Sequence, residues 1–168
     1  MTPIHHNNKS PNLPAFLSTA CKLIPSKIHS NILVVLLNHL LAEQIRDGEL
    51  DFLKDNCLCV NITDANIKYY VSLNKDNSNK NKLFSVLPGN TNDIEIKASV
   101  FDFMQLAARQ QDPDTLVFQR RLIMQGNTEL GLELKNFIDG LDLESSNSFS
   151  TIDIILKKSL PVYSRLFS

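Results

Sequence analysis

The spacing of apolar residues predicts two helices near the start of the chain. Apolar side chains recur every three or four positions from 13 to 24 and again from about Ser26 to Arg46, which is typical of amphipathic helices. Asp47-Gly48 is a suitable end for the second, because glycine takes the left-handed conformation that often follows a helix. Its segment Ile32–Leu41 is apolar on nearly all sides, so it is either deeply buried or faces lipid. Residues 49–54 are expected to form one more helical turn.

Apolar and polar residues alternate in the middle of the chain, which predicts strands. A first antiparallel pair is expected at 57–63 and 67–73, and a second at 82–87 and 93–99. The polar segment 74–81 between the two pairs is expected to be a loop.

Helical spacing returns at 100–110, 128–141 and 151–160, with a fifth strand expected at 118–125 and a Ser-rich linker at 144–150. This order predicts an α+β fold, in which a five-stranded, mostly antiparallel sheet is covered by helices. Helices over one face of a curved sheet leave room for an apolar pocket between the layers.

Four segments of different character divide the chain. We expect a disordered start at 1–12, a helical hairpin at 13–47, the sheet-containing domain at 48–143, and a linker with an amphipathic helix at 144–168.

Composition narrows the class of protein. Seventeen Lys and Arg against eighteen Asp and Glu give a net charge of −1, which disfavours nucleic acid as a partner. An apolar content of 43% allows a proper core and excludes collagen-like or wholly disordered chains. Three cysteines (Cys21, Cys57 and Cys59) form no disulfide framework, and the start does not resemble a signal peptide. A cytoplasmic protein is therefore expected, without a membrane-spanning segment.

Motifs for catalysis, metals and cofactors are not found. All four histidines precede the expected sheet, and His29 and His39 are ten residues apart, which does not fit the H-E-x-x-H pattern. The chain has no G-x-S-x-G turn and no Gly-rich phosphate loop. We therefore expect no catalytic residue, no bound metal and no cofactor.

A group of charged residues has a structural explanation. Asp112-Pro113-Asp114 is expected to break the helix at 100–110, and helix capping and turn formation are sufficient reasons for its two carboxylates. Arg120 and Arg121 are neighbours on the expected fifth strand and would point to opposite faces. One of them needs a partner on the covered face, which Asp112 or Asp114 could supply, so an ion pair is favoured over catalysis.

The longest informative stretch reads DPDTLVFQRRL at 112–122, followed by GNTELGLELKN at 126–136. With GELDFL at 48–53 and the helix Phe101–Arg109, it resembles the UbiT family of bacterial ubiquinone biosynthesis accessory factors. These carry a lipid-binding domain of the sterol carrier protein type. The resemblance covers about residues 13 to 141. Asn127 stands where the family usually has Asp, and asparagine also caps helices well.

The resemblance implies a sterol carrier protein-like fold with a hydrophobic tunnel and no catalysis of its own. Proteins of this family support the oxygen-independent route to ubiquinone. They are thought to hold isoprenoid quinone precursors beside the ring hydroxylases UbiU and UbiV. Each CH₂ of such a tail costs about 0.8 kcal/mol in water, so enzymes outside the bilayer need a carrier. The first two helices would then dock on the inner membrane surface.

Under this interpretation two groups of residues form the site. The apolar candidates for contacts with a lipid tail are Phe103, Met104, Leu116, Phe118, Leu122, Leu130, Leu134 and Ile138. The residues expected to shape the rim by capping and ion pairing are Asp112, Pro113, Asp114, Thr115, Arg120, Arg121 and Asn136. From the pattern alone the apolar group is ordinary core, because a filled core and a cavity have the same sequence signature.

Three alternatives stay open. The chain could be a protein-interaction adaptor that uses Ile32–Leu41 or its last helix, with a tightly packed interior. It could be a lipid-acting enzyme, which requires Asp112, Asp114 and Arg120 to converge in the pocket. It could also be a general phospholipid carrier, which shares the cavity but not the quinone ligand.

Overall fold

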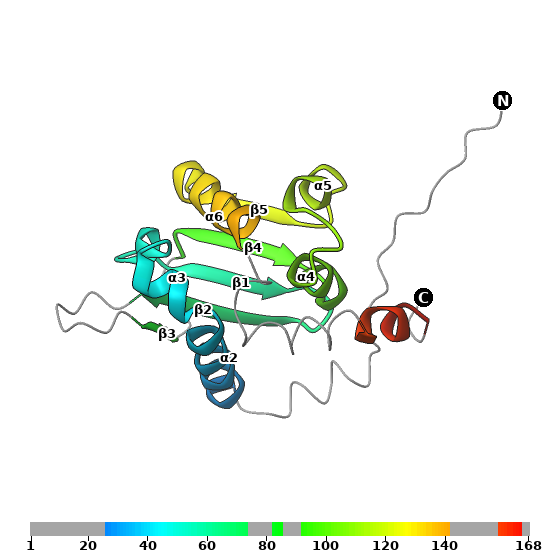
Figure 1. The fold of residues 1–168 in the computed structure, drawn as a ribbon, viewed down its shortest axis with the longest axis horizontal. Coiled ribbons are helices and arrows are strands. Elements are labelled where there is room, and N and C mark those ends of the chain that lie inside the picture. The colour runs from blue at the N-terminus through cyan, green and yellow to red at the C-terminus, as the bar shows by residue number, and fades with distance from the viewer. Residues whose placement is uncertain (1–25, 74–81, 86–91, 142–157, 166–168) are drawn as a thin grey trace.

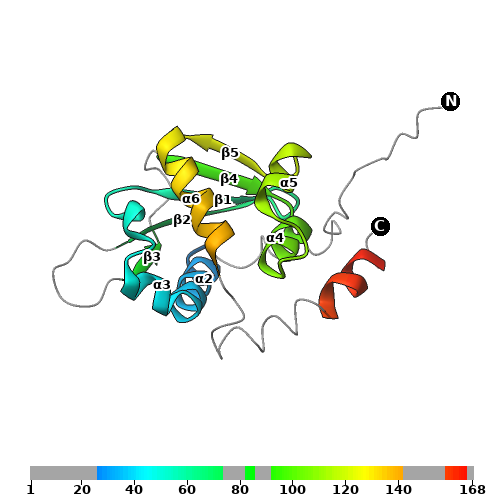
Figure 2. The same cartoon turned by 45° about the horizontal axis from the view of Figure 1, so that its top comes forward.

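A β-sheet forms one layer of the structure, and helices cover one of its faces (Figures 1 and 2). The computed structural model describes residues 26–73, 82–85, 92–141 and 158–165. The expectations for 1–25, 74–81 and 142–157 lie outside these residues.

The strands run in the order β3-β2-β1-β4-β5 across the sheet. Their bounds are Leu58–Ile62 (β1), Ile67–Leu73 (β2), Leu83–Ser85 (β3), Ile94–Ala98 (β4) and Ile123–Gly126 (β5). Three pairs are antiparallel, but the central strands β1 and β4 are parallel, so the sheet is mixed. The predicted pairing of 82–87 with 93–99 is therefore wrong. β3 pairs with β2 at one edge, and β4 crosses over to the centre, where its apolar side chains are buried.

Alternation along β4 separates the two faces of the sheet. Ile94, Ile96 and Ala98 are buried, whereas Glu95 and Lys97 between them are partly exposed. The register places Ile94 opposite Leu58 of β1, so apolar residues of neighbouring strands share one face. The core lies on this apolar face.

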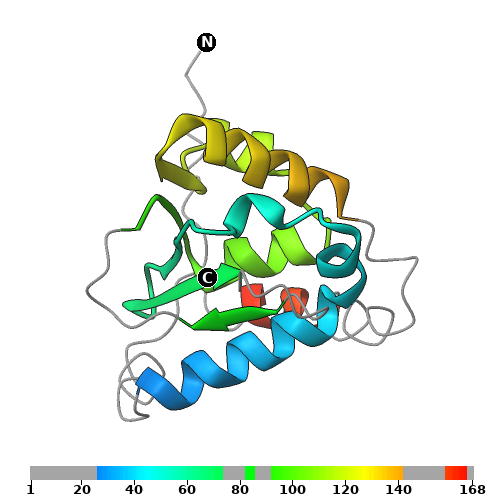
Figure 3. The same cartoon turned by 90° about the vertical axis from the view of Figure 1, so that its left-hand side faces the viewer.

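Helices pack on the apolar face mainly at its two edges. Their bounds are Ser26–Leu40 (α2), Ala42–Asp47 (α3), Asp51–Leu53 (the 3₁₀ turn η1), Val100–Ala107 (α4), Pro113–Phe118 (α5) and Thr128–Gly140 (α6). α2 packs on β3 and β2, and α6 packs on β5. Figure 3 shows α2 and α6 on opposite sides of the helical layer.

Local signals in the sequence define the ends of these helices. Gly48 has φ of 82°, and its N–H binds carbonyl groups of the last turn of α3. Ser99 caps α4 by accepting a hydrogen bond from the Asp102 N–H at 3.1 Å. Asn127 caps α6 by accepting from the Glu129 N–H at 2.9 Å. The helix predicted from Ser26 to Arg46 is divided into α2 and α3, although the Leu41 N–H still donates to the Leu37 carbonyl at 2.8 Å.

The fifth strand predicted at 118–125 is wrong in its first half. Residues 113–118 form the helix α5, and β5 begins only at Ile123. Asp112 caps α5 and Pro113 occupies its first turn, where proline's missing N–H and fixed φ do not disturb a helix. The Asp-Pro pair, predicted to break a helix, starts one.

The last described helix covers the outer side of α4. Residues 158–165 are helical, so the predicted end at Leu160 is wrong, and the helix continues through Pro161. Leu160 is buried against Phe101, and the ring of Tyr163 stacks on that of Phe101 with centroids 5.6 Å apart. These tertiary contacts outweigh the local preference of proline to end a helix. Burial, with smaller contributions from the charges of Asp64 and Asp102, raises the pKa of Tyr163 to about 12.

Candidate functional site

An apolar layer lies between the sheet and the helices. Its floor is the buried face of the strands, including Val71, Ile94 and Ile96, which are at most 3% exposed. Partly exposed apolar side chains pack against this floor, and we call them the interlayer cluster. The cluster consists of Leu37, Leu40, Phe52, Val60, Phe103, Leu106, Met124, Phe137, Ile138 and Leu141.

The interlayer cluster joins elements that are far apart in the sequence. Phe52 of η1 and Phe137 of α6 lie side by side, with ring centroids 6.3 Å apart and planes inclined at 57°. Leu37 and Leu40 come from α2, and Phe103 comes from α4. Partly exposed apolar side chains over an apolar floor form a surface that can hold a hydrocarbon chain with little polar desolvation.

The eight predicted lipid contacts lie in different environments. Leu116, Leu122, Leu130 and Leu134 are 0 to 7% exposed and belong to the core beneath the interlayer cluster. Phe103 and Ile138 belong to the cluster itself. Met104 packs with the second apolar cluster, around Phe101 and Leu160. Phe118 is 92% exposed.

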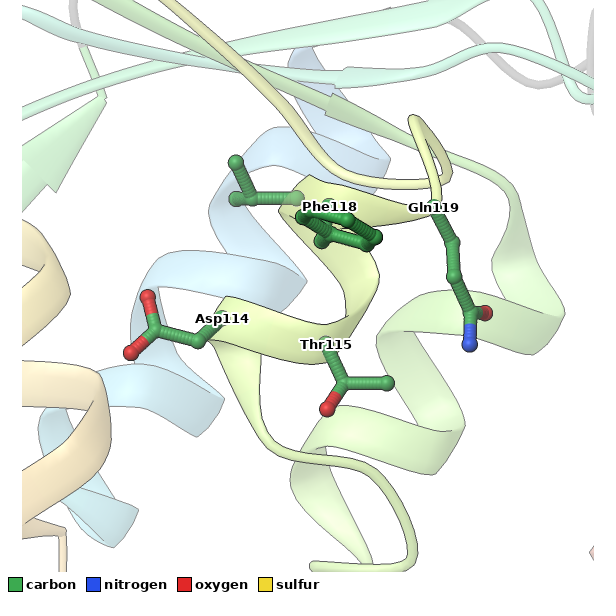
Figure 4. Close-up of a pocket in the computed structure, with 5 residues that line it drawn as sticks. Asp114, Thr115, Phe118 and Gln119 are labelled. Carbon is green, nitrogen blue, oxygen red and sulfur yellow. The ribbon is translucent and has the colours of Figure 1, made fainter.

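Phe118 lies on the surface because α5 ends there. Leu116 of the same helix is fully buried, and Phe118, two positions later, points out to the solvent. It lines an open surface pocket together with Asp114, Thr115, Val117 and Gln119 (Figure 4). This pocket is on α5 and not between the layers.

The polar residues of the 112–122 stretch hold α5 in place. The Asp112 carboxylate accepts hydrogen bonds from the Thr115 hydroxyl at 2.6 Å and from the Thr115 N–H at 2.8 Å. These two hydrogen bonds hold the pKa of Asp112 below its usual value. Asp114 pairs with Lys135 of α6 at 2.9 Å, and Pro113 is buried. Asp112 thus caps α5, whereas Asp114 pairs with a lysine of α6 and not with the predicted arginine.

Arg121, rather than Arg120, is the arginine with a buried partner. Its Nε donates to Asp102 Oδ1 of α4 at 2.9 Å, and its guanidinium also donates to Gln105 and Gln119. The prediction that Asp112 or Asp114 supplies this partner is wrong, because α5 turns the chain so that Arg121 points back to α4. Arg120 is exposed with φ of 59°.

The convergence required for a lipid-acting enzyme is not found at Asp112, Asp114 and Arg120. Asp112 binds Thr115, Asp114 binds Lys135, and Arg120 is exposed in the turn after α5. Asn136 is exposed on α6. No group of three or more potential metal-binding side chains occurs in the ranges that the structure describes.

The other face of the sheet is polar, and sequence reasoning missed the network on it. Glu95 accepts hydrogen bonds from Asn61 at 2.8 Å and pairs with Lys68 at 3.1 Å and Lys97 at 3.2 Å. Burial raises the pKa of Glu95, but these hydrogen bonds outweigh it and hold that pKa below its usual value. The alternation around Glu95 indicates a polar face, but not these partners, because they depend on the strand register.

Two thiols are buried beside this polar face. Cys57 and Cys59 are free, and Cys59 is fully buried. Burial raises the pKa of both thiols, with Asp93 adding to the effect at Cys57 and Glu95 at Cys59. Because thiolates are the reactive form, both cysteines are disfavoured as nucleophiles.

The helix α2 presents an apolar surface to the solvent. Ile28, Ile32, Val35 and Leu36 are between 44 and 70% exposed, and their spacing places them on one side of the helix. The opposite side contributes Leu37 and Leu40 to the interlayer cluster. None of the described helices is long and apolar enough to span a bilayer.

Comparisons with known proteins agree with this architecture. The SCP-2 sterol transfer family model matches residues 37–139, from α2 to α6. The ubiquinone biosynthesis accessory factor UbiT of Escherichia coli K12 is 36% identical over 131 residues, covering 78% of this chain and 72% of that protein. UbiT of Escherichia coli O157:H7 matches equally well.

A solved structure supports the same fold. "UbiJ-SCP2 Ubiquinone synthesis protein" matches with a TM-score of 0.50 and 18% identity, covering 68% of this chain and 97% of that one. At this identity the match concerns the fold alone. The family model and the identity to UbiT show the family directly. The chain belongs to the SCP-2 sterol transfer family and is a relative of UbiT.

Proposed function

We propose that this protein is a non-catalytic lipid-binding accessory factor in oxygen-independent ubiquinone biosynthesis. It holds the isoprenoid tail of a quinone precursor between sheet and helices and presents the head group to ring-modifying enzymes of the UbiU and UbiV type. The similarity to UbiT supports a role in ubiquinone biosynthesis, and membership of the SCP-2 family supports a lipid as the ligand.

The interlayer cluster is the observation that carries the proposal. Phe52, Phe137 and Ile138 stay partly exposed above a buried apolar floor, so a hydrocarbon chain can reach them. A hydrocarbon tail placed there replaces water at these side chains and gains about 0.8 kcal/mol per buried CH₂ group. Within the predicted site, Phe103 and Ile138 are therefore the strongest candidates for direct contact. Leu116, Leu122, Leu130 and Leu134 belong to the buried core that supports the interlayer cluster.

Extraction of the purified protein with organic solvent, followed by mass spectrometry against a mock preparation, tests the proposal. We expect an isoprenoid quinone or precursor at near-stoichiometric amount. An enriched phospholipid would instead favour the general carrier. An empty extract, together with no uptake of an added polyprenylphenol, would favour the adaptor and overturn the proposal.

Two tryptophan variants locate the ligand. Ile138→Trp places a larger side chain in the interlayer cluster and is expected to reduce polyprenylphenol uptake severalfold, with little loss of stability because the position is partly exposed. Phe118→Trp is the matched control, since Phe118 is 92% exposed, and it should take up lipid normally. Equal uptake by both variants would place the ligand elsewhere.

We also propose that α2 rests on the cytoplasmic surface of the inner membrane. The helix has no acidic residue, and Lys27, His29 and His39 are its charged or titratable side chains. A surface without carboxylates that exposes Ile32 and Val35 is suited to an anionic bilayer interface.

Val35→Asp should weaken this contact. In flotation with vesicles of phosphatidylethanolamine and phosphatidylglycerol, we expect binding to weaken by about tenfold or more, because an apolar side chain is lost and a charge is added. Leu132→Asp, at a 58% exposed position on α6, is the control and should float like the unmodified protein. Equal flotation of the Val35 variant would rule out α2 as the membrane contact.

A further inference from the structure

One buried oxygen atom in the helical layer lacks a hydrogen-bond donor. The Oε1 atom of Gln44, in α3, is shielded from solvent, and no donor among the described residues reaches it. This state is costly for an amide oxygen, because the atom gives up its water without gaining another donor. Since nearly all buried polar atoms in folded proteins are paired, a donor supplied by a ligand is one explanation for such an atom.

The amide of Asn38, six residues earlier in the chain, shows what a structural role looks like. Its Nδ2 donates to the Leu83 carbonyl, and the Leu83 N–H donates to its Oδ1, both at 2.8 Å. Both ends of that amide are used to hold α2 on β3. The Gln44 oxygen makes no such bond within the described parts of the chain, so support of the fold does not explain it.

Gln44 continues the apolar face that α2 and α3 turn towards the sheet. Helical hydrogen bonds run through the junction of the two helices, since the Ile45 N–H donates to the Leu41 carbonyl at 2.8 Å. Leu40 and Leu41 precede Gln44 by four and three positions, so all three lie on one side of the helix. Leu40 belongs to the interlayer cluster and Leu41 to the buried core against which the cluster packs. Gln44 therefore adds a polar atom to an apolar surface.

The aromatic pair of the interlayer cluster lies at the same end of the helical layer. The backbone carbonyl of Gln44 accepts the Glu49 N–H at 3.0 Å, which fixes α3 to the start of the turn that carries Phe52. Phe52 in turn meets Phe137 of α6. Figure 3 shows the C-terminal end of α6 on the same side of the molecule as the end of α2 that continues into α3. Beyond Gln44 the helix is polar, and the side chain of Arg46 is 71% exposed.

We infer that the Gln44 amide oxygen accepts a hydrogen bond from the head-group hydroxyl of the bound lipid. This inference rests on the proposed lipid-binding function, and it adds the chemistry of the head group and the end of the layer at which the head group lies. With the tail along the interlayer cluster, a hydroxyl on the aromatic ring supplies the donor that the oxygen lacks.

An amide oxygen selects a ligand by charge and by hydrogen-bonding capacity. It accepts hydrogen bonds and donates none, so the ligand must bring the donor. A phenol brings one without a charge. The phosphodiester of a phospholipid is an anion whose oxygens only accept, and a cationic ammonium head group would have to leave water for the edge of an apolar layer. Gln44 thus favours a neutral polyprenylphenol over a phospholipid.

Titration calorimetry with 2-farnesylphenol and with its methyl ether tests the inference. The ether has the same tail but no hydroxyl hydrogen. We expect the unmodified protein to bind the phenol about three- to tenfold more tightly than the ether, and Gln44→Leu to lose this preference, because leucine has no acceptor. Gln110→Leu, at an exposed position after α4, is the matched control and should keep the preference.

The stability of the lipid-free protein provides a second measurement. Leucine at position 44 removes a buried oxygen that lacks a donor, so thermal unfolding of Gln44→Leu should show a Tm equal to or above that of the unmodified protein. A Tm several degrees lower would show that the amide supports the fold, and it would overturn the inference.

Failure of this inference can be told apart from failure of the carrier proposal. If the unmodified protein binds phenol and ether equally well, or if Gln44→Leu weakens both ligands to the same extent, the protein still binds lipid, but Gln44 is not the head-group acceptor. If neither ligand binds to the unmodified protein, the carrier proposal and this inference are both overturned.

Discussion

The Arg121→Met variant is expected to lose about 3–5 kcal/mol of its free energy of unfolding, because it leaves a buried carboxylate without its cation. Asp102 is 3% exposed and the side chain of Arg121 15% exposed. Without the guanidinium, Asp102 keeps the hydrogen bonds with the Ser99 hydroxyl and loses its Nε donor at 2.9 Å. Chemical unfolding followed by circular dichroism measures the loss.

The neighbouring arginine provides a matched control. Arg120→Met removes the same charge from an exposed position and is expected to change the free energy of unfolding by less than about 0.5 kcal/mol. A similar small effect for both variants would show that the Asp102–Arg121 pair contributes little to stability.

The Gly126→Ala variant is expected to lose about 3 kcal/mol or more, because its backbone conformation excludes a side chain. Gly126 has φ of +122°, and an added Cβ would lie 2.3 Å from the Asp93 carbonyl oxygen and 2.9 Å from Ile94 Cα. The same carbonyl accepts the Asn127 N–H at 2.8 Å, so relief of the clash would disturb both the end of β5 and the cap of α6.

Gly140→Ala tests whether the effect is specific to that conformation. An added Cβ at Gly140 meets nothing within 4 Å, and alanine restricts the unfolded chain more than glycine does. Thermal unfolding should show a Tm equal to or slightly above that of the unmodified protein. If Gly126→Ala were as stable as Gly140→Ala, the close approach of β5 to Asp93 would be wrong.

Local patterns were sufficient to predict most of the regular elements. The strand predicted at 67–73 is β2, and the alternation that predicts 93–99 is the burial pattern of β4. Gly48 and Asn127 mark helix ends through backbone chemistry that is visible in the sequence. The pairing of the strands, in contrast, could not be predicted from local patterns. The parallel contact of β1 with β4 joins strands separated by two others in the sequence, and no local signal distinguishes it from a hairpin.

The error at α5 has a local cause. The sequence predicts a strand at 118–125 because Asp112-Pro113 is typical of a helix end, although the same pair can cap a helix and fill its first turn. Arg120 then takes φ of 59° without being glycine, which reverses the direction of the following residues. The partner of Arg121 therefore comes from α4, at Asp102, a contact that spacing alone does not predict.

The candidate site shows the limit of composition-based reasoning most clearly. Leu116 and Phe118 are both apolar and two residues apart, yet one is fully buried and the other 92% exposed. Phe52 and Phe137, which meet across the interlayer cluster, were not singled out, because their proximity depends on how η1 and α6 pack. Helical spacing identified the core face of α6 correctly, but not which of its residues remain partly open.

The parallel pair at the centre of the sheet has a consequence for synthesis on the ribosome. Cys59 of β1 and its neighbour Glu95 of β4 are 36 residues apart, so β1 and β2 leave the ribosome well before β4 is available. Until then the apolar face of this hairpin has no complete sheet around it and is open to aggregation. α2 is made earlier, and it packs on β2 and β3 in the finished structure. α2 is therefore positioned to cover the β1–β2 hairpin while the rest of the chain is still being translated.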